Sequence, residues 1–450
     1  MAEFKKFNYK TLQDLKDDIE RLGVDIPTTE DLSPLSKPVK IGEHTAPNAF
    51  CVLPMEGFDC LPDGSPSDLT YRRYMRYGAG GSGLIWFEAC SVNEGGKSNP
   101  ACMVLQDKSF DATKKMISGI NKAAHESLGF KPVKILQLTH SGRQSRPYGD
   151  SKPVITKNCP VFDARFGIDA DYPTITDEQL DAMIPDYVKA AKLAKEAGFE
   201  GVDIKSCHRY LISELMSSYD RPGKYGGSLE NRASFFLNIV REVRKATGPD
   251  FIIGTRISLY DGHPYPIGFG ASEKNGHPDL EEPMKFVDMM VSAGVDFLSS
   301  SGGDGFNTPW VIRQFNMPVI GGKTPQEHPL EGIARMLELT RKLQGAAGKI
   351  PVIGNCYSWL REFLPNVGAA VLARGEASFI GFGRGAFAYP DMPKDTFAGK
   401  IDRKKCCITC SKCVQIMHDG GRNGCPIRDT ELYLPIYKEN RKAAIARTGA

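Results

Sequence analysis

Short apolar runs alternate with longer amphipathic stretches through most of this sequence. The runs typical of strands cover residues 50–54, 83–87, 133–138, 201–204, 251–257, 295–299, 350–353 and 378–382. Residues 177–197 and 229–247 repeat apolar positions at spacings of three and four, which indicates amphipathic helices. Glycines such as Gly198 and Gly294 follow the helical patterns, where helices commonly end. Eight strand–helix units predict an α/β protein with a closed (β/α)8 TIM barrel.

The alternating pattern occupies only part of the chain. We expect an N-terminal lead-in over residues 1–45 with a helix at 11–22, a barrel over 46–392, and a Cys-rich C-terminal extension over 393–450. A doubly wound open sheet is the alternative, but no GxGxxG motif follows the first strand. The extension is shorter than a second nucleotide-binding domain, which needs ~100–150 residues.

Charge and hydropathy limit the kinds of partner that the 450-residue chain is expected to bind. It carries 57 Lys and Arg against 54 Asp and Glu, a net charge of +3, and has no long basic arm for nucleic acid. The N-terminus is charged, and no stretch approaches the ~20 apolar residues of a membrane span. We therefore expect a soluble cytoplasmic protein that binds neither nucleic acid nor membrane. A homo-oligomer is compatible with this sequence.

Five of the 12 cysteines fall within residues 406–425. Three thiols on a tight loop and a remote Cys-Pro suit a [4Fe-4S] cluster, with zinc as the alternative. Zinc sites normally use two CxxC pairs, whereas the fourth cysteine here stands alone. The predicted ligands are Cys407, Cys410, Cys413 and Cys425. Cys406 is an alternative first ligand to Cys407.

In a barrel the chemistry lies at the carboxyl ends of the strands. An amide, small residues and late arginines at these ends suit a flat heterocycle that carries a phosphate. No GxSxG or HExxH motif is present, which excludes acyl-transfer and zinc-protease chemistry of those types. The candidate residues are Pro54, Met55, Glu56, Ala89, Gln137, Lys205, His208, Tyr210, Arg256, Gly354, Asn355, Gly383 and Arg384.

Four segments now point to a known family: QLTHSGRQS, GFEGVDIKSCHRYLISEL, KYGGSLENR and LPMEGFDCLPDGSPS. Together they resemble the old yellow enzyme family of FMN-dependent oxidoreductases. With the Cys-rich extension, the chain is most similar to the iron–sulfur subgroup that contains 2,4-dienoyl-CoA reductase and trimethylamine dehydrogenase, but without its C-terminal FAD/NAD(P) domain.

The resemblance implies that FMN binds at the barrel mouth. Pro54, Met55 and Ala89 would line the ring system, with Glu56 at a position beside it that is often Thr or Cys. Gln137 would bind the pyrimidine edge, and Arg256 would lie near N1. The phosphate would be held by Gly354, Asn355, Gly383 and Arg384.

The same resemblance implies reduction of a C=C bond conjugated to a carbonyl, in an enone, enoate or enoyl substrate. Tyr210 would be the proton donor, while His208 and Lys205 would bind the carbonyl oxygen. Lys205 and Glu56 depart from the family pattern, and we consider that they pair with each other. His140 and Arg143 are expected to support the loop after the third strand.

The electron source stays open at this stage. NAD(P)H could reduce FMN directly, or an external donor protein could deliver electrons through the cluster. Two alternatives use the same cofactors differently: an amine dehydrogenase or demethylase running the site oxidatively, and an electron-transfer subunit without its own substrate.

Overall fold

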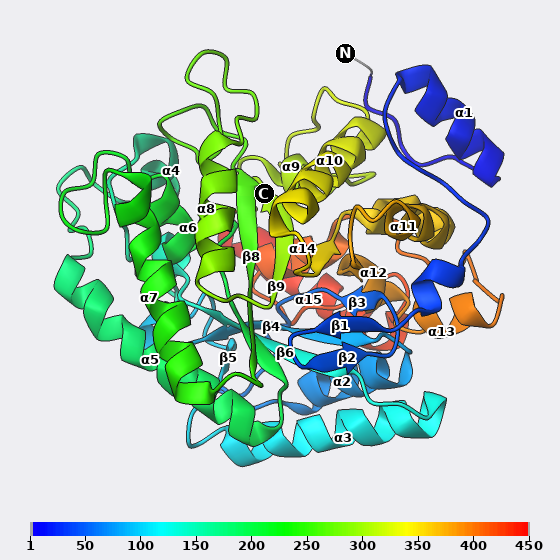
Figure 1. Ribbon diagram of the computed structural model, residues 1–450, viewed down its shortest axis with the longest axis horizontal. Coiled ribbons are helices and arrows are strands. Elements are labelled where there is room, and N and C mark those ends of the chain that lie inside the picture. Colours follow the sequence, from blue (N-terminus) through cyan, green and yellow to red (C-terminus); the bar gives the residue numbers. More distant parts are fainter. Residues whose placement is uncertain (1–2, 449–450) are drawn as a thin grey trace.

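Eight parallel strands close into a barrel in the computed structural model, which describes residues 3–448 (Figure 1). The strands follow each other in chain order around the barrel. The first strand pairs with both the second and the last, which closes the barrel. They are β3 (Phe50–Val52), β4 (Leu84–Ser91), β6 (Val133–Thr139), β7 (Gly201–Ile204), β8 (Ile252–Tyr260), β9 (Phe297–Gly302), β10 (Val352–Gly354) and β11 (Phe379–Phe382). All eight overlap the predicted runs, so the barrel prediction is confirmed.

The barrel strands are apolar along nearly their whole length because both of their faces are covered. One face points into the barrel, where Trp86 meets the edge of the Phe297 ring. The other face packs against the surrounding helices. Two-residue strand β5 (Met103–Val104) extends the sheet beside β4 and was not predicted.

Seven long helices surround the barrel: α2 (Asp68–Ala79), α3 (Phe110–Leu128), α5 (Asp177–Ala197), α7 (Leu229–Thr247), α8 (Glu281–Ser292), α10 (Pro329–Ala347) and α11 (Leu364–Ala373). Helices α5 and α7 have the predicted bounds. Thr176 and Gln179 form a capping box at the start of α5, and Gly198 ends it with φ 97°.

Shorter helices occupy the connections. They are α4 (Pro160–Phe166), α6 (Leu211–Met216), α9 (Pro309–Ile312), α12 (Arg384–Ala388), α13 (Met392–Phe397) and the 3-10 helices η1 (Ser33–Ser36), η2 (Glu94–Gly96), η3 (Gly142–Gln144) and η4 (Tyr357–Phe363). Among residues 3–448, no helix combines the length and the apolar character needed to cross a bilayer.

The N-terminal segment contains α1 (Leu12–Leu22), as expected, and an unpredicted hairpin of β1 (Val39–Ile41) and β2 (His44–Ala46). Ile41 and Ala46 of the hairpin pack with the apolar layer inside the barrel. The expected boundary between residues 45 and 46 therefore falls within β2, and the boundary between 392 and 393 falls within α13.

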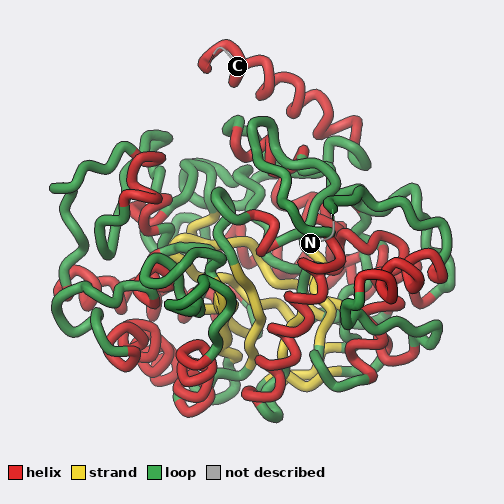
Figure 2. The backbone as a smooth tube through the Cα atoms, turned by 90° about the horizontal axis from the view of Figure 1, so that it is seen from above, coloured by secondary structure: helices red, strands yellow, loops and turns green. Residues whose placement is uncertain are grey.

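The C-terminal segment adds α14 (Lys412–His418) and α15 (Thr430–Thr448). Helix α15 runs across the top of the molecule in Figure 2. Between the helices, the backbone N–H of Asn423 donates to the Gly57 carbonyl at 2.6 Å, and its side-chain amide donates to the Glu56 carbonyl at 2.9 Å. The extension is thus fixed to the loop that follows β3.

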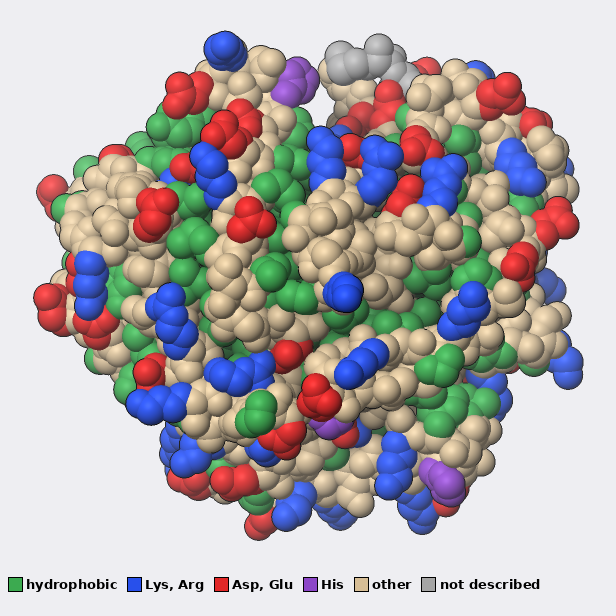
Figure 3. Space-filling model, in the orientation of Figure 1, with side chains coloured by type: hydrophobic (Ala, Val, Ile, Leu, Met, Phe, Trp, Pro, Cys, Tyr) green, Lys and Arg blue, Asp and Glu red, His purple; other side chains and the backbone are tan. Residues whose placement is uncertain are grey.

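The face of the molecule shown in Figure 3 mixes acidic and basic side chains and carries no large patch of one sign. This agrees with the near balance of charge in the sequence.

Candidate functional site

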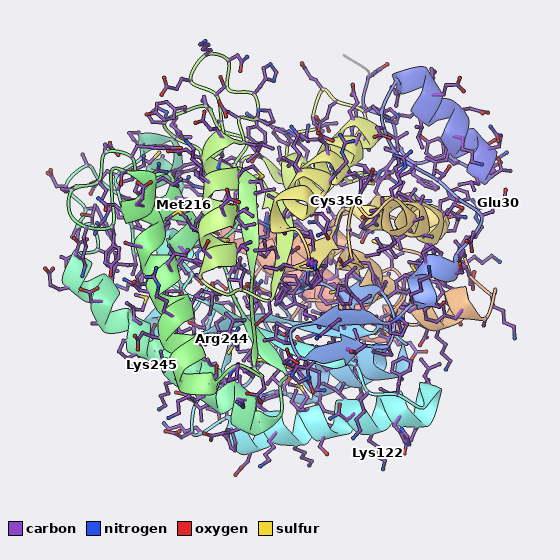
Figure 4. All side chains as sticks on the ribbon, in the orientation of Figure 1. Glu30, Lys122, Met216, Arg244, Lys245 and Cys356 are labelled. Carbon is purple, nitrogen blue, oxygen red and sulfur yellow. The ribbon has the colours of Figure 1, made fainter. Side chains whose placement is uncertain are left out.

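A cavity of about 830 Å³ opens at the carboxyl ends of the barrel strands. Its wall comes from the ends of β3, β6, β7 and β8 and from the C-terminal segment, which contributes Val414, Met417 and His418. Cys356 lies inside the molecule, whereas Lys122 and Lys245 lie on outer helices (Figure 4). The candidate residues that line the cavity are Pro54, Met55, Glu56, Gln137, Lys205, His208, Tyr210, Arg256, Asn355, Gly383 and Arg384.

Two candidate residues lie behind the cavity wall. Ala89 is buried in β4 opposite Gln137 in the sheet register and is not part of the lining. Gly354 is also outside the lining. A Cβ atom there would come within 2.6 Å of the Tyr357 hydroxyl, so this glycine is required for packing.

Tyr210 lies between a cation and an anion. The Lys205 Nζ is 3.4 Å from the centroid of the Tyr210 ring, and the Tyr210 hydroxyl is 3.4 and 3.5 Å from the two Glu56 carboxylate oxygens. Burial and the negative charge of Glu56 hold the pKa of Tyr210 well above its usual range. Lys205 and Glu56 form no ion pair, which corrects the expected pairing: the tyrosine ring separates them.

His208 has a left-handed backbone conformation, with φ 63°, that places its ring in the cavity. Its Nε2 is 2.8 Å from the Ser301 hydroxyl at the end of β9. Burial and the positive charges of Arg256 and Lys205 hold the pKa of His208 well below its usual range. The imidazole is therefore neutral at neutral pH.

Behind Gln137 lies Asp203, which sequence reasoning missed. The Gln137 amide nitrogen donates to one Asp203 carboxylate oxygen at 2.5 Å, and the Arg256 backbone N–H donates to the other at 3.1 Å. Burial raises the pKa of Asp203 to about 7. Because Asp203 holds the amide nitrogen, the Gln137 carbonyl oxygen is left to face the cavity.

The buried arginines that line the cavity differ from the other buried arginines in that they lack carboxylate partners. Among the described residues, seven arginines are less than 9% exposed. Five of them form salt bridges with carboxylates: Arg73, Arg143, Arg209, Arg221 and Arg232. The other two, Arg256 and Arg384, line the cavity without a carboxylate within 4.0 Å, and each leaves a buried guanidinium nitrogen without a partner. A buried cation is costly unless it is paired, so the site is built for an anion.

Arg313, which was not predicted from the sequence, lines the cavity together with Arg256 and Arg384. Burial and the charges of Arg384 and Arg256 lower its pKa to about 10.

His140 and Arg143 support the loop after β6, as expected. Arg143 binds Asp163 and Glu214, and the His140 ring accepts from the Gly142 N–H.

A second, small cavity lies among four cysteines of the C-terminal segment. Cys407, Cys410, Cys413 and Cys425 line it together with Arg384, which also lines the large cavity. Cys406 is outside this lining, and its thiol donates to the Asp402 carbonyl. The geometry therefore favours Cys407 over Cys406 as the member of the group.

The spacing of these thiols differs from that of a single-ion site. Among residues 3–448, only Asp59, Cys60 and Glu88 form a group of three potential ligands within 4.8 Å of one another. Their two carboxylates already bind Arg73. Tetrahedral zinc, with Zn–S bonds of ~2.3 Å, would bring its sulfurs to about 3.8 Å from each other. No three of the four cysteines have their sulfurs that close together.

Comparison with models of known protein families identifies the family of this chain. Residues 34–277 match the model of the NADH:flavin oxidoreductase / NADH oxidase family. The chain belongs to this family. The old yellow enzyme relationship expected from the signature segments is thereby confirmed, while the iron–sulfur subgroup stays a prediction.

Several relatives of this flavin oxidoreductase are longer than the chain itself. It is 28% identical over 375 residues to an NADH oxidase of Thermoanaerobacter brockii, covering 83% of this chain and 52% of the relative. It is 25% identical over 439 residues to a cinnamate reductase of Clostridium sporogenes, covering 92% and 61%. The chain thus spans about half to three fifths of these curated relatives.

Among solved structures, a complex of 2-naphthoyl-CoA reductase with 2-naphthoyl-CoA aligns with a TM-score of 0.69 at 22% identity. The alignment covers 92% of this chain and 59% of the other. It supports the barrel fold.

Proposed function

We propose that this family member is an FMN-dependent ene-reductase that acts on a C=C bond conjugated to a carbonyl. The observation that carries the proposal is the position of Tyr210. Its phenol is held in the cavity, protonated, between Lys205 and Glu56.

The residues present fit FMN. The guanidinium groups of Arg256 and Arg384, which have no carboxylate partner, would hold the phosphate and an electron-rich edge of the ring, with Asn355 and Gly383 beside them. The Gln137 carbonyl oxygen would accept a hydrogen bond from the pyrimidine edge, while Pro54 and Met55 would lie along the ring. When bound, FMN would supply the hydride.

The chain would supply the proton and bind the carbonyl. Tyr210 is the general acid, because burial and Glu56 keep its phenol protonated throughout the neutral pH range. The ammonium of Lys205 on the ring face stabilises the negative charge that develops on the phenol oxygen as the proton leaves. Glu56, 3.4 Å from that oxygen, faces the phenol hydroxyl and can orient it.

His208 would bind the substrate carbonyl oxygen. A neutral imidazole donates from one nitrogen only. If the Ser301 hydroxyl donates to Nε2, the proton stays on Nδ1, which can then donate to the carbonyl. A donor in this position stabilises the charge that develops on the oxygen.

Two relatives support the reaction class through their names, cinnamate reductase and 2-naphthoyl-CoA reductase, since both names denote reduction of unsaturated acids or their thioesters. As reductant we propose NAD(P)H acting at the same cavity, or a donor protein acting through the cluster described below.

The test is Tyr210→Phe, which removes the acidic hydroxyl but keeps the ring and its contact with Lys205. We expect reoxidation of the reduced enzyme by an enone to slow roughly tenfold or more, the contribution of a positioned general acid. FMN content should stay at the wild-type level. Stopped-flow absorbance of the flavin measures both, and an unchanged reoxidation rate would contradict the role of Tyr210.

We also propose that Cys407, Cys410, Cys413 and Cys425 bind a [4Fe-4S] cluster. Four thiols around one cavity provide one ligand for each iron, and their separation exceeds that of a single zinc site. Arg384 lines both cavities, so the cluster would lie next to the FMN phosphate region. When bound, the cluster would carry single electrons.

Cys413→Ser and Cys406→Ser form a matched pair to test this ligand set. After anaerobic reconstitution, Cys413→Ser should lose most of the iron and the visible cluster absorbance, because one ligand is missing. Cys406→Ser should keep about four irons per chain, as expected for a cysteine outside the cavity. Iron loss in Cys406→Ser but not in Cys407→Ser would show that the ligand set is wrong.

A further inference from the structure

The lining of the large cavity is strongly cationic. It contains seven Lys and Arg side chains but a single carboxylate, Glu56. The cations are Arg146, Arg165, Lys205, Arg256, Arg313, Arg384 and Arg447. None of them lies within 4.0 Å of a carboxylate in the described part of the chain, although salt bridges are frequent elsewhere in the molecule.

Four of these cations form an inner and an outer set. Arg256 and Arg384 are buried on β8 and at the start of α12, where the phosphate and the ring edge of the proposed FMN account for them. Arg146 and Arg165 are exposed and come from the long connection between β6 and α5. The phosphate of one flavin cannot neutralise both sets, so the outer set needs a separate explanation.

Arg165 of the outer set is held in place by aromatic stacking. The Arg165 guanidinium carbon lies 3.8 Å from the centroid of the Phe306 ring, and the His418 ring stacks on Phe306 at 5.7 Å between centroids and 26° between planes. Three separate segments thus meet here: α4, the loop after β9 and the end of α14. Arg146 is close enough that its charge contributes to lowering the pKa of Arg165, after the effect of burial.

The loop that carries Phe306 is fixed by hydrogen bonds to Asp304. One Asp304 carboxylate oxygen accepts from the Phe306 and Asn307 backbone N–H groups, at 2.8 and 2.6 Å. The other lies 2.5 Å from the buried His263 Nε2. Asp304 is the one carboxylate that acts on Arg165, and its oxygens are already occupied. The Arg165 guanidinium is therefore positioned but not neutralised, and Arg146 has no carboxylate within 4.0 Å among the described residues.

We propose that Arg165, stacked on Phe306, and the neighbouring Arg146 bind the anionic end of the unsaturated substrate. The substrate class is then an alkene that carries a carboxylate or a phosphate remote from the reacting bond. This inference rests on the proposed ene-reductase function and adds which substrates that site selects. A guanidinium pair suits either oxyanion because both accept two parallel hydrogen bonds.

The experiment uses the FMN-loaded enzyme and two matched pairs of probes. 4-(3-Oxobut-1-enyl)benzoate and its methyl ester differ by one carboxylate charge, which lies across the aromatic ring from the reacting bond. The crotonyl thioesters of pantetheine 4′-phosphate and of pantetheine differ by one phosphate. The absorbance change of bound FMN gives Kd for each probe, and steady-state assays give KM and kcat.

We expect the anionic member of at least one pair to bind about tenfold or more tightly than its neutral partner. The pair that shows the difference identifies carboxylate or phosphate as the recognised group. Arg165→Gln, alone and with Arg146→Gln, should remove this preference by raising Kd and KM for the anionic probe, with little change for the neutral one. Arg374→Gln, a matched change at an exposed arginine paired with Asp25, should leave the preference intact.

Equal binding of charged and neutral probes by the wild-type enzyme would overturn the inference. A loss of affinity for both members in Arg165→Gln would do the same, because it indicates a structural effect. If no probe is reduced but the anionic preference in Kd is present and arginine-dependent, the anion site stands and the proposed reaction fails. The two proposals can therefore fail separately.

Discussion

At the scale of single residues, Asp203 controls which atom of Gln137 faces the cavity, and hence which atom the proposed FMN would meet. An amide has a donor end and an acceptor end, and the carboxylate of Asp203 binds the donor end. The acceptor end then matches a cofactor N–H group. A residue outside the cavity lining thus determines the hydrogen-bond polarity of the wall.

Asp203→Asn should reverse this polarity. The new amide must still accept from the Arg256 backbone N–H, so its NH₂ group faces Gln137 and favours a flipped side chain. An unmatched buried donor costs ~1–3 kcal/mol, and we expect FMN affinity to fall roughly tenfold or more. Fluorescence titration of the apoprotein with FMN measures the change.

The same residue predicts a pH dependence. Because burial raises the pKa of Asp203 to about 7, its carboxylate is ionised and binds the Gln137 NH₂ group above that pH and becomes protonated below it. FMN affinity should therefore decrease as the pH falls from about 8 to about 6 in the wild type. Asp203→Asn should show low affinity at both values, and a parallel pH profile in the two proteins would contradict this account.

Tyr210, His208 and the cysteine group could be found from the sequence because they fall in motif segments or have a characteristic spacing. Arg146, Arg165 and Arg313 could not, because they lie in connections whose course depends on tertiary packing. In the sequence, Arg146 and Arg165 each have an aspartate four residues later, Asp150 and Asp169, as in ordinary surface ion pairs. An exposed arginine is itself ordinary, so nothing in the sequence distinguishes these two.

At the scale of elements, the interior layer of the barrel restricts the size of its residues. A Cβ atom on Gly254 in β8 would come within 2.1 Å of the Phe297 ring, which itself packs against Trp86. This contact is fixed on both sides by neighbouring strands, so it cannot relax easily.

Gly254→Ala should destabilise the protein by about 1–3 kcal/mol, the usual effect of overpacking a core. Gly345→Ala is the matched control, because Gly345 lies in α10 with nothing within 4 Å of the added Cβ. It should be neutral or stabilise the fold by ~0.5–1 kcal/mol. Urea unfolding midpoints compare the two, and equal midpoints would show that the barrel interior accommodates the added methyl group.

The elements also show which sequence signals are reliable. All eight barrel strands were predicted because strands buried on both faces form continuous apolar runs. The hairpin β1–β2 and strand β5 were missed because their two or three residues are too short to show a period. Their pairing is set by contacts with the barrel rather than by local preference.

At the scale of the whole molecule, charge is distributed unequally between surface and interior. The net charge of +3 and the mixed surface in Figure 3 give no indication of a cationic cavity. Its field becomes apparent only when the lining is assembled from strands, loops and the C-terminal segment. Composition alone therefore predicts no nucleic-acid partner, and it could not indicate an anionic ligand.

The hydrogen bonds of Asn423 to Glu56 and Gly57 have a consequence for biosynthesis. Residues near position 55 leave the ribosome long before those near position 420, yet the two segments build one wall. All eight barrel strands are synthesised before residues 414–418, so the barrel can close while the cavity still lacks its C-terminal wall. The cavity is therefore complete only once the C-terminal segment has left the ribosome.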